Sequence, residues 1–292
     1  MQKGVKFRIY PNKEQQTIIN QTLGCCRLIY NKGLAMRNEA YQNGNKIGYS
    51  QTSAMLTDLK KSDDFAFLKA VDSIALQQSL RDLDRGFVNF FQKRASHPTF
   101  KSKQNHHQSY RTINQGDNIR IVGKYIKLPK SGFVKIRQTM GVEKINNVTI
   151  ERTPTNKYFA VLNVKFEPQP MSNKGGKIGI DVGIKEFYSD SNGNVVYNPK
   201  YLEKSMRKLI REQRKLSRKE KGSTNRNKQR VKVALVHEKI TNQRNDFLQK
   251  QSTMLIRENQ TICIEDLKVK NMMRLFVWEQ LFEVVQAIMI MC

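Results

Sequence analysis

Apolar and basic residues alternate along residues 5–10. This period of two predicts a strand with one face buried. Pro11 ends the strand, and Asn12 followed three residues later by Gln15 is the capping-box pattern that begins a helix. We therefore expect a helix that runs from this cap to about residue 43.

A helical period continues through the next part of the chain, and it predicts helices over residues 50–60 and 72–94. In the second of these, seven apolar residues recur at steps of three and four, which is typical of a buried helix face. They are Ile74, Leu76, Leu80, Leu83, Phe87, Phe90 and Phe91.

From about residue 109 the period returns to two, and Gly, Pro or Asn turns separate short apolar runs. The predicted strands are 119–122, 125–128, 134–137, 147–152 and 158–164. Many short strands with regular turns indicate a small β-barrel. The strand at 5–10 could complete this barrel, with the helices inserted between.

A linker over residues 169–176 separates a second pattern of elements. It predicts strands at 177–183 and 261–266, a hairpin of 187–190 with 195–197, and helices at 200–221, 227–258 and 275–291. The helix at 227–258 has an apolar face made of Val231, Leu235, Ile240, Phe247, Leu248 and Leu255. Strands alternating with long helices indicate a separate α/β domain.

The charge of the chain gives the strongest indication of its function. It has 52 Lys plus Arg against 25 Asp plus Glu, a formal net charge of +27. Such an excess indicates a nucleic-acid-binding protein, because each neutralised phosphate releases a counterion. A basic protein of the ribosomal type remains an alternative within this class. A membrane-surface protein is disfavoured, since we find no acylation motif or amphipathic anchor.

Cysteine usage and hydropathy indicate the compartment. The four cysteines form no CxxC pair and no zinc spacing, and adjacent Cys25 and Cys26 are best interpreted as packing residues on a helix. No secretory signal opens the chain, and no stretch approaches the roughly 20 apolar residues of a spanning helix. We therefore expect a reduced, cytoplasmic protein with no membrane partner.

Two carboxylates follow apolar strands, Asp181 in the run Asp-Val-Gly and Glu265 far along the chain. Carboxylates on adjacent strands begin a two-metal phosphoryl-transfer site. The alternative, which spacing alone favours, is that each carboxylate ends its strand facing solvent. Asp-Val-Gly after a buried strand is also typical of both sugar-kinase-like and RNase H-like folds, so that one motif does not decide the fold.

Basic residues recur at steps of three and four along the helix predicted at 200–221. This cationic stripe consists of Lys204, Arg207, Lys208, Arg211, Arg214, Lys215, Arg218 and Lys219. An ordinary solvated helix face mixes charges of both signs, so this excess favours contact with phosphates. His106 and His107 lack a third ligand for a metal site, and RNA contact or a plain loop are the two interpretations left open.

Several blocks of the sequence, in this order, resemble those of TnpB, an RNA-guided nuclease family encoded by bacterial insertion sequences. The resemblance covers residues 5 to about 274. Its blocks are Lys6-Phe7-Arg8-Ile9-Tyr10-Pro11, Arg27-Leu28-Ile29-Tyr30-Asn31, Ser73-Ile74-Ala75-Leu76-Gln77-Gln78-Ser79-Leu80, Tyr110-Arg111-Thr112, Ile126-Lys127-Leu128-Pro129-Lys130, Gly179-Ile180-Asp181-Val182-Gly183-Ile184-Lys185, Leu216-Ser217-Arg218-Lys219-Glu220-Lys221-Gly222-Ser223 and Ile264-Glu265-Asp266-Leu267.

The resemblance implies an α+β multidomain fold. A split β-barrel wedge domain (residues 1–10 and 95–170) holds an inserted helical recognition domain (11–94). A truncated RuvC domain of the RNase H-like α/β type, lacking the zinc ribbon, follows (171–292). The implied partners are a guide RNA and double-stranded target DNA with a short flanking motif, the motif being read by protein and the target by RNA pairing.

The resemblance also implies roles for single residues. Reading of the flanking motif falls to Tyr49, Ser53, Ser73, Ile74 and Gln77. At Ser73 and Ile74 the family often carries Lys and Phe, which predicts an altered motif. Contact with the nucleic-acid backbone, inferred from the cationic stripe, is assigned to Arg207, Arg211, Arg214, Lys215, Arg218 and Lys219.

One departure from the family pattern directs the functional prediction. Asp181 and Glu265 match the first two carboxylates of the nuclease site, while the third belongs to an Asp-rich block after a four-Cys zinc ribbon, and no Asp follows Asp266 in this sequence. Glu279 and Glu283 are interpreted as surface residues. We therefore expect no enzyme activity, with Asp181 and Glu265 as remnants. Mg²⁺ is then neither needed for binding nor productively bound, and no zinc is expected.

The predicted function is RNA-guided, sequence-specific DNA binding without cleavage, acting as a transcriptional repressor. In this the chain resembles the TnpB-derived nuclease-dead repressors. Two alternatives remain. One is a residual RNA-guided endonuclease whose missing carboxylate comes from a partner chain, and the other is an inert transposase-associated remnant.

Overall fold

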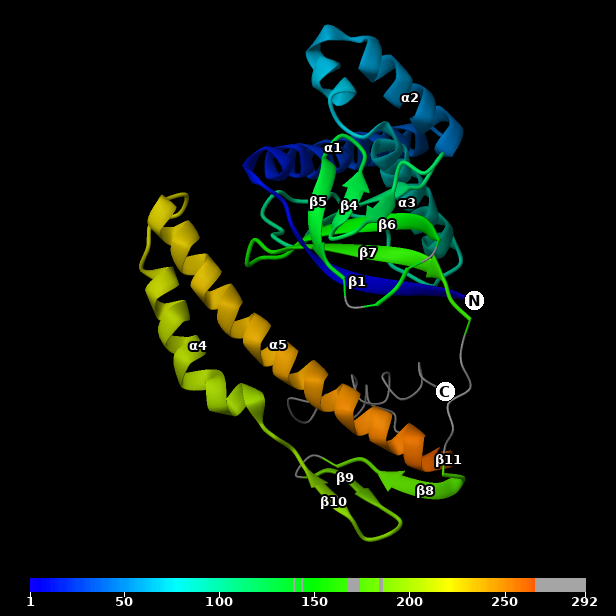
Figure 1. Ribbon diagram of the computed structural model, residues 1–292. Helices are drawn as coiled ribbons and strands as arrows, with labels where there is room; N and C mark the ends of the chain where they lie inside the picture. Colours follow the sequence, from blue (N-terminus) through cyan, green and yellow to red (C-terminus); the bar gives the residue numbers. More distant parts are fainter. Residues whose placement is uncertain (139, 143, 168–173, 184–185, 266–292) are drawn as a thin grey trace. The chain divides into compact units, whose positions relative to one another are not determined.

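The chain folds into two compact units, Met1–Pro168 and Gln169–Cys292, each with its own apolar core. The structure is a computed structural model that describes residues 1–138, 140–142, 144–167, 174–183 and 186–265. The apolar helix predicted at 275–291 lies outside the described residues. Figure 1 shows the elements of both units.

The first unit is built on a curled seven-stranded antiparallel sheet of order β2-β6-β7-β1-β5-β4-β3 (Figure 1). Its strands are β1 (Gln2–Tyr10), β2 (Gln108–Ile113), β3 (Arg120–Val122), β4 (Tyr125–Leu128), β5 (Gly132–Arg137), β6 (Ile145–Arg152) and β7 (Tyr158–Lys165). As predicted, the N-terminal strand completes the sheet, between β7 and β5. Among the described residues no ladder joins the edge strands β2 and β3, so the sheet is curled without closing into a hydrogen-bonded barrel.

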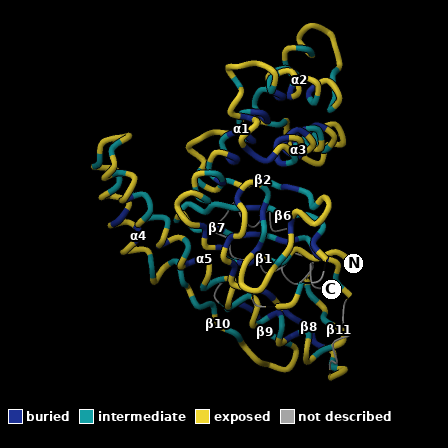
Figure 2. The backbone as a smooth tube through the Cα atoms, turned by 45° about the horizontal axis from the view of Figure 1, so that its top comes forward, coloured by how far each residue is buried: buried dark blue, intermediate teal, exposed yellow. Residues whose placement is uncertain are grey.

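Alternate residues of these strands form one face of the core. Phe7 and Ile9 on β1, Val134 on β5, and Val148 and Ile150 on β6 are almost completely buried, and they belong to one apolar cluster with residues of the helices. The residues between them point to the opposite side of the sheet, as a pleated strand requires. The dark segments in Figure 2 mark this buried interior.

The helices of this unit are α1 (Lys13–Gln42), α2 (Tyr49–Lys61) and α3 (Ser73–Phe91), with a short 3-10 helix, η1 (Asp63–Lys69), between the last two. The predicted capping box begins α1. The backbone N–H of Gln15 donates to Asn12 Oδ1 at 2.8 Å, and the backbone N–H of Asn12 donates to Gln15 Oε1 at 3.0 Å. Cys25 and Cys26 are buried in the core, which confirms their packing role.

Three details of the sequence prediction for this unit were wrong. Helix α3 ends at Phe91 rather than at residue 94, because Lys93 adopts a left-handed conformation (φ 58°) that terminates helices. Phe91, predicted to be buried, is 71% exposed and packs on the ring of Phe87. Strand β2 and helix η1 were not predicted as elements.

The second unit contains a four-stranded sheet of order β10-β9-β8-β11. Its strands are β8 (Gly176–Asp181), β9 (Glu186–Asp190), β10 (Val195–Tyr197) and β11 (Asn259–Ile264). Strands β9 and β10 form the predicted antiparallel hairpin, β8 pairs antiparallel with β9, and β11 runs parallel to β8. A parallel pair requires a long crossover, which the two helices between β10 and β11 supply.

These helices, α4 (Tyr201–Ser217) and α5 (Thr224–Glu258), form an antiparallel hairpin. The guanidinium of Arg226 joins their ends by donating to the carbonyl oxygens of Leu216 and Lys219 at 2.7 and 2.8 Å. The predicted bounds, 200–221 and 227–258, were off by about one turn where the helices meet. The apolar face of α5 was also partly wrong, since Val236 is buried against α4 while Leu235 is 46% exposed.

Candidate nucleic-acid-binding and carboxylate sites

The ends of β8 and β11 bring together the two carboxylates that the sequence singled out. In the parallel register Ile264 pairs with Ile180, so Glu265 follows β11 where Asp181 ends β8. Both side chains are exposed at the rim of an open depression of about 500 Å³. The strand pairing thus makes neighbours of residues that lie far apart in the sequence.

Asp190 lines the same depression, but its carboxylate is engaged in the β9–β10 turn. Its Oδ1 accepts from the backbone N–H groups of Asn192 and Asn194 at 2.9 and 2.8 Å, and its Oδ2 accepts from the Asn194 side chain at 2.9 Å. These hydrogen bonds, that of the Asn194 side chain first, lower the pKa of Asp190. Asp181 and Glu265 therefore remain as the carboxylates available here within the described residues.

Two exposed carboxylates suit a single Mg²⁺, which prefers oxygen ligands and keeps several waters. Asp181 and Glu265 would hold such an ion, and the ion would polarise a phosphoryl oxygen. Within the described part of the chain, no three His, Cys, Asp or Glu side chains are placed to hold a metal ion. That Asp181 and Glu265 are remnants of a nuclease site, without productively bound Mg²⁺, stays a prediction.

The cationic stripe lies along α4 and continues past its end. Its residues form two adjacent rows on one side of the helix, Arg207, Arg211, Arg214 and Arg218 in one and Lys204, Lys208, Lys215 and Lys219 in the other. All except the partly buried Lys219 are exposed. Figure 2 shows how little of α4 is buried.

The second row borders a groove of about 430 Å³ between α4 and α5, which we call the basic groove. Five lysines line it: Lys204, Lys208 and Lys215 from α4, and Lys232 and Lys239 from α5. The two lysines of α5 were not predicted from the sequence, because they stand out only once the hairpin places them opposite α4. The spacing of Lys232 and Lys239, two helical turns, is the signal that could have identified them.

Glu212 is the acidic residue among those that line the basic groove, and its side chain is only 10% exposed. Its Oε2 accepts from Gln229 Nε2 at 2.8 Å, and its Oε1 accepts from Arg211 Nε at 3.3 Å and Lys215 Nζ at 3.4 Å. The hydrogen bond from Gln229, followed by those from the two cations, lowers the pKa of Glu212. The carboxylate thus links α4 to α5 and orients cations of the stripe.

Replacing Glu212 by Gln is expected to remove a pH-dependent part of the hairpin's stability. Because the pKa of the folded state lies below the ordinary value of 4.5, the contribution is present above that value and is lost as pH falls through the folded pKa. The difference in melting temperature between wild type and Glu212→Gln should therefore shrink between pH 6 and pH 3. A difference that stays constant over this range would contradict the role of the carboxylate.

The residues assigned to the flanking motif lie on two packed helices of the first unit. Tyr49 and Ser53 occupy the first turns of α2, and Ser73 and Gln77 lie one turn apart on α3. The guanidinium of Arg81 lies 4.7 Å from the centroid of the Tyr49 ring.

At the other end of α2, Lys60 Nζ donates to Ser73 Oγ at 3.1 Å. The two helices are therefore antiparallel, and the row Ser73, Gln77 and Arg81 borders α2. Ile74 starts the same turn of α3, where its backbone N–H is capped by Asp72 at 2.9 Å. We call this surface the α2–α3 face. It also carries the cations Lys60 and Arg81, which the sequence analysis did not select.

Replacing the exposed Gln77 by Ala is expected to weaken DNA binding at one base position by about 1–3 kcal/mol, if its amide contacts a base edge. Binding should be measured on targets that differ at single flanking positions. Gln42→Ala, an exposed glutamine at the end of α1, is the matched control. An equal loss on every flanking sequence would argue against base readout by Gln77.

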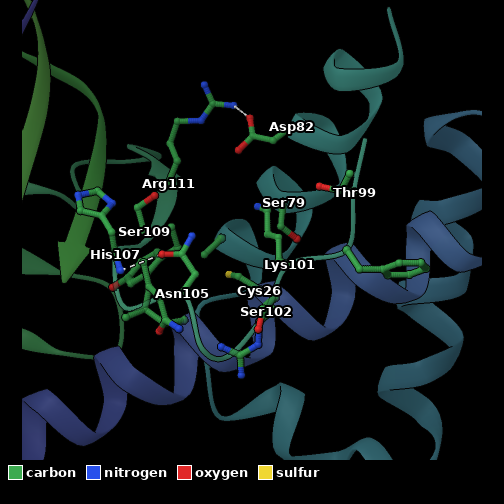
Figure 3. Close-up of a pocket in the computed structure, with 16 residues that line it drawn as sticks. Cys26, Ser79, Asp82, Thr99, Lys101, Ser102, Asn105, His107, Ser109 and Arg111 are labelled. Atoms are coloured by element: carbon green, nitrogen blue, oxygen red, sulfur yellow. Dashed lines mark hydrogen bonds and ion pairs between the residues drawn. The ribbon is translucent and has the colours of Figure 1, made fainter. Parts of the chain in front are cut away.

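A polar pocket of about 380 Å³ lies between α1, α3 and the segment leading into β2 (Figure 3). Arg111 Nη2 pairs with Asp82 Oδ1 at 2.5 Å, and His107 lies in the wall. Lys101 Nζ lies 4.0 Å from the centroid of the Tyr30 ring, and burial lowers the pKa of Lys101. The position of His107 is compatible with either interpretation of the histidine pair, RNA contact or plain loop.

Comparison with known proteins identifies relatives along almost the whole chain. Residues 1–46 match the family HTH_OrfB_IS605, described as "Helix-turn-helix domain", and residues 151–275 match OrfB_IS605, described as "Probable transposase". Over residues 1–46 the structure has β1 and α1, a strand followed by one long helix. In the described residues we find no helix long and apolar enough to cross a membrane.

Two curated relatives carry the name "Putative RNA-guided DNA endonuclease". The protein from Streptomyces pristinaespiralis is 39% identical over 94% of this chain and 69% of its own length. InsQ of Escherichia coli K12 is 36% identical over 91% of this chain and 66% of its own length. The chain thus spans about two thirds of the length of these relatives.

A solved structure, a cryo-EM CRISPR-Cas12f ternary complex, aligns over 95% of this chain and 70% of the matched chain in that structure. Its sequence identity of 12% and TM-score of 0.38 are too low to carry an argument. The sequence identities to the curated relatives are sufficient by themselves to assign the family. With two matching family regions and a relative at 39% identity, the chain belongs to the IS605 OrfB family, also known as TnpB.

Proposed function

We propose that this chain binds a guide RNA and, through it, double-stranded DNA that carries a short flanking motif. The observation that carries the proposal is the α4–α5 hairpin, where the cationic stripe borders the five-lysine basic groove. Rows of cations along a helix neutralise successive phosphates of a nucleic-acid backbone. The names of the two relatives support an RNA-guided mode of recognition.

Within this proposal the domains keep their predicted roles. The sheet of the first unit would serve as the wedge, the α2–α3 face would read the flanking motif, and the second unit would be the RuvC-like part. The α2–α3 face suits this role because it combines amide, hydroxyl and phenol groups with two cations. Such groups reach both base edges and phosphates.

A finer proposal concerns cleavage. We infer that the polypeptide of residues 1–292 by itself binds its target without cutting it, and represses transcription by occupying a promoter. Composition supports this inference, since Asp266 is the last aspartate in the sequence, whereas the family pattern calls for a third carboxylate beside Asp181 and Glu265. A single pair of carboxylates is a poor clamp for the two ions of an in-line displacement.

The second candidate is a functional endonuclease. Two observations favour it: the names of the relatives, and the parallel pairing of β8 and β11 that brings Asp181 beside Glu265. In this case another chain would provide the remaining ligand. The third candidate, an inert remnant, predicts a chain that binds nucleic acid only through its charge.

One experiment separates the three candidates. The chain is purified from cells, its bound RNA is sequenced, and matched DNA with a randomised flanking region is added with Mg²⁺. A discrete RNA with tight, motif-dependent binding and intact strands supports the binding-only proposal, and a promoter-reporter assay then tests repression. Cleavage that Asp181→Asn abolishes supports the endonuclease. Absence of a discrete RNA would refute guided binding altogether.

A further inference from the structure

One side of the curled sheet carries an unusual set of exposed side chains. On β1, β5 and β4 the residues that alternate with the buried ones point away from the core, and on β3 the residues on either side of Ile121 do so. We call this surface the outer sheet face. Its members are Arg8, Tyr10, Arg120, Val122, Tyr125, Lys127, Phe133, Lys135 and Arg137, of which Arg8 and Lys127 are partly buried.

Strand register places aromatic rings next to cations on the outer sheet face. Tyr10 pairs with Lys135, which pairs in turn with Tyr125 on the next strand. In the adjacent row Phe133 pairs with Lys127, and Lys127 pairs with Arg120. Directly paired side chains on one face are neighbours, so each of the three rings lies next to a lysine.

The three rings are half exposed, and the guanidinium of Arg8 lies 5.4 Å from the centroid of the Tyr10 ring. Tyr10 is 46% exposed, Tyr125 48% and Phe133 49%. Rings of this size seldom remain half exposed on several neighbouring strands, because clustered apolar surface in water is unfavourable, and such clusters mark interaction sites. These strands therefore offer flat apolar platforms at regular positions.

The charge of the outer sheet face has one sign. None of the four strands contains Asp or Glu. Among the described residues, Lys127, Lys135 and Arg137 form no ion pair, whereas Lys6, which precedes Arg8 on β1, is paired with Glu151 on β6. Unneutralised cations between exposed rings match a ligand with negative charges between flat aromatic groups.

We propose that the outer sheet face binds an unpaired, single-stranded segment of RNA. Bases stack on Tyr10, Tyr125 and Phe133, and the intervening phosphates contact the lysines and arginines, as in sheet-based single-strand binders. A duplex does not fit, because the faces of its bases are covered by their stacked neighbours. The choice of RNA over DNA rests on the proposed function, in which RNA is the resident strand.

The test measures binding of a fluorescent oligouridine RNA, about 12 nucleotides long, to the full chain by anisotropy. This probe is unstructured and contains no guide sequence. Tyr125→Ala combined with Phe133→Ala should lower the affinity about tenfold for each ring lost. Tyr41→Ala combined with Tyr197→Ala is the matched control, since these tyrosines are 75% and 72% exposed on α1 and β10.

Two further variants keep the test informative if the alanine pair does not fold. Tyr125→Phe with Phe133→Tyr retains both rings and should bind as wild type does. Lys127→Ala with Lys135→Ala leaves the rings in place and should reduce the slope of log affinity against log salt by about 0.7 per lysine. Thermal unfolding of each variant is compared with that of wild type.

Unchanged RNA affinity in both the ring and the lysine variants would overturn the inference. Tighter binding of duplex RNA, or of single-stranded DNA of matching sequence, would overturn it as well. The outcome is separable from that of the proposed function. Guide-RNA co-purification and target binding test the function, whereas oligouridine binding tests the outer sheet face alone.

Discussion

Replacing Arg207, Arg214 and Arg218 together by Gln is expected to lower the affinity for RNA and for target DNA by roughly 100-fold at moderate salt. These three arginines belong to the first row of the cationic stripe, and their side chains are exposed. They lie away from the Leu209, Val236 and Ile240 contacts that hold the hairpin together, so its stability should change little. The affinity falls because each arginine replaced by Gln leaves one phosphate without its cation, so that binding releases fewer counterions from the nucleic acid.

Affinities measured between 50 and 300 mM salt test this expectation. The slope of log affinity against log salt should fall by about 0.7–0.9 for each arginine that contacts a phosphate. The matched control replaces by Gln three arginines that are also exposed but lie outside the stripe, Arg85, Arg94 and Arg257. If both triple variants lose the same affinity, only net charge matters, and the stripe has no specific role.

Replacing Gly176 by Ala is expected to destabilise the second unit by about 1–3 kcal/mol, the usual cost of overpacking. A Cβ at this position would lie 2.8 Å from the backbone carbonyl oxygen of Glu258 and 2.7 Å from Asn259 Oδ1. Gly176 pairs with Asn259 at the start of the parallel ladder. Since the backbone oxygen cannot rotate away, the start of β11 must shift relative to β8.

Gly179→Ala, on the same strand as Gly176, is the matched control. A Cβ at Gly179 would lie 3.6 Å from the Ser191 side chain, which is an ordinary contact distance. Hydrogen exchange of residues 176–181 and 259–264, together with thermal unfolding, provides the measurement. Exchange should accelerate in Gly176→Ala and stay near the wild-type rate in Gly179→Ala. Equal exchange in the two variants would mean that the close approach of β8 to residue 258 is not needed for pairing.

Most secondary structure could be predicted from the sequence, because it follows from local periodicity and capping. The alternating residues of β1, the Asn12–Gln15 capping box and the β9–β10 hairpin all have their signal within a few neighbouring residues. Errors occurred where a single backbone conformation decides the boundary, as at Lys93, or where packing selects between neighbouring apolar residues, as at Leu235 and Val236. Strand β2 was missed because its alternation is short and largely polar.

The candidate sites differ in how far they could be predicted from the sequence. The cationic stripe could be found without a structure, since helical spacing alone aligns its residues. The basic groove could not, because Lys232 and Lys239 join it only through the pairing of α5 with α4. The outer sheet face is a further case, where strand register places Tyr125 and Phe133 on either side of cations.

The sequence by itself therefore determined most of the strands and helices, the basic character of the chain and its family resemblance, because each of these follows from local pattern or composition. Only the tertiary structure decided that Asp181 and Glu265 meet, that Glu212 is held between two helices, and which exposed rings share a face. The reason is physical. Such juxtapositions arise from the register of strands and helices distant in sequence, which no local pattern encodes.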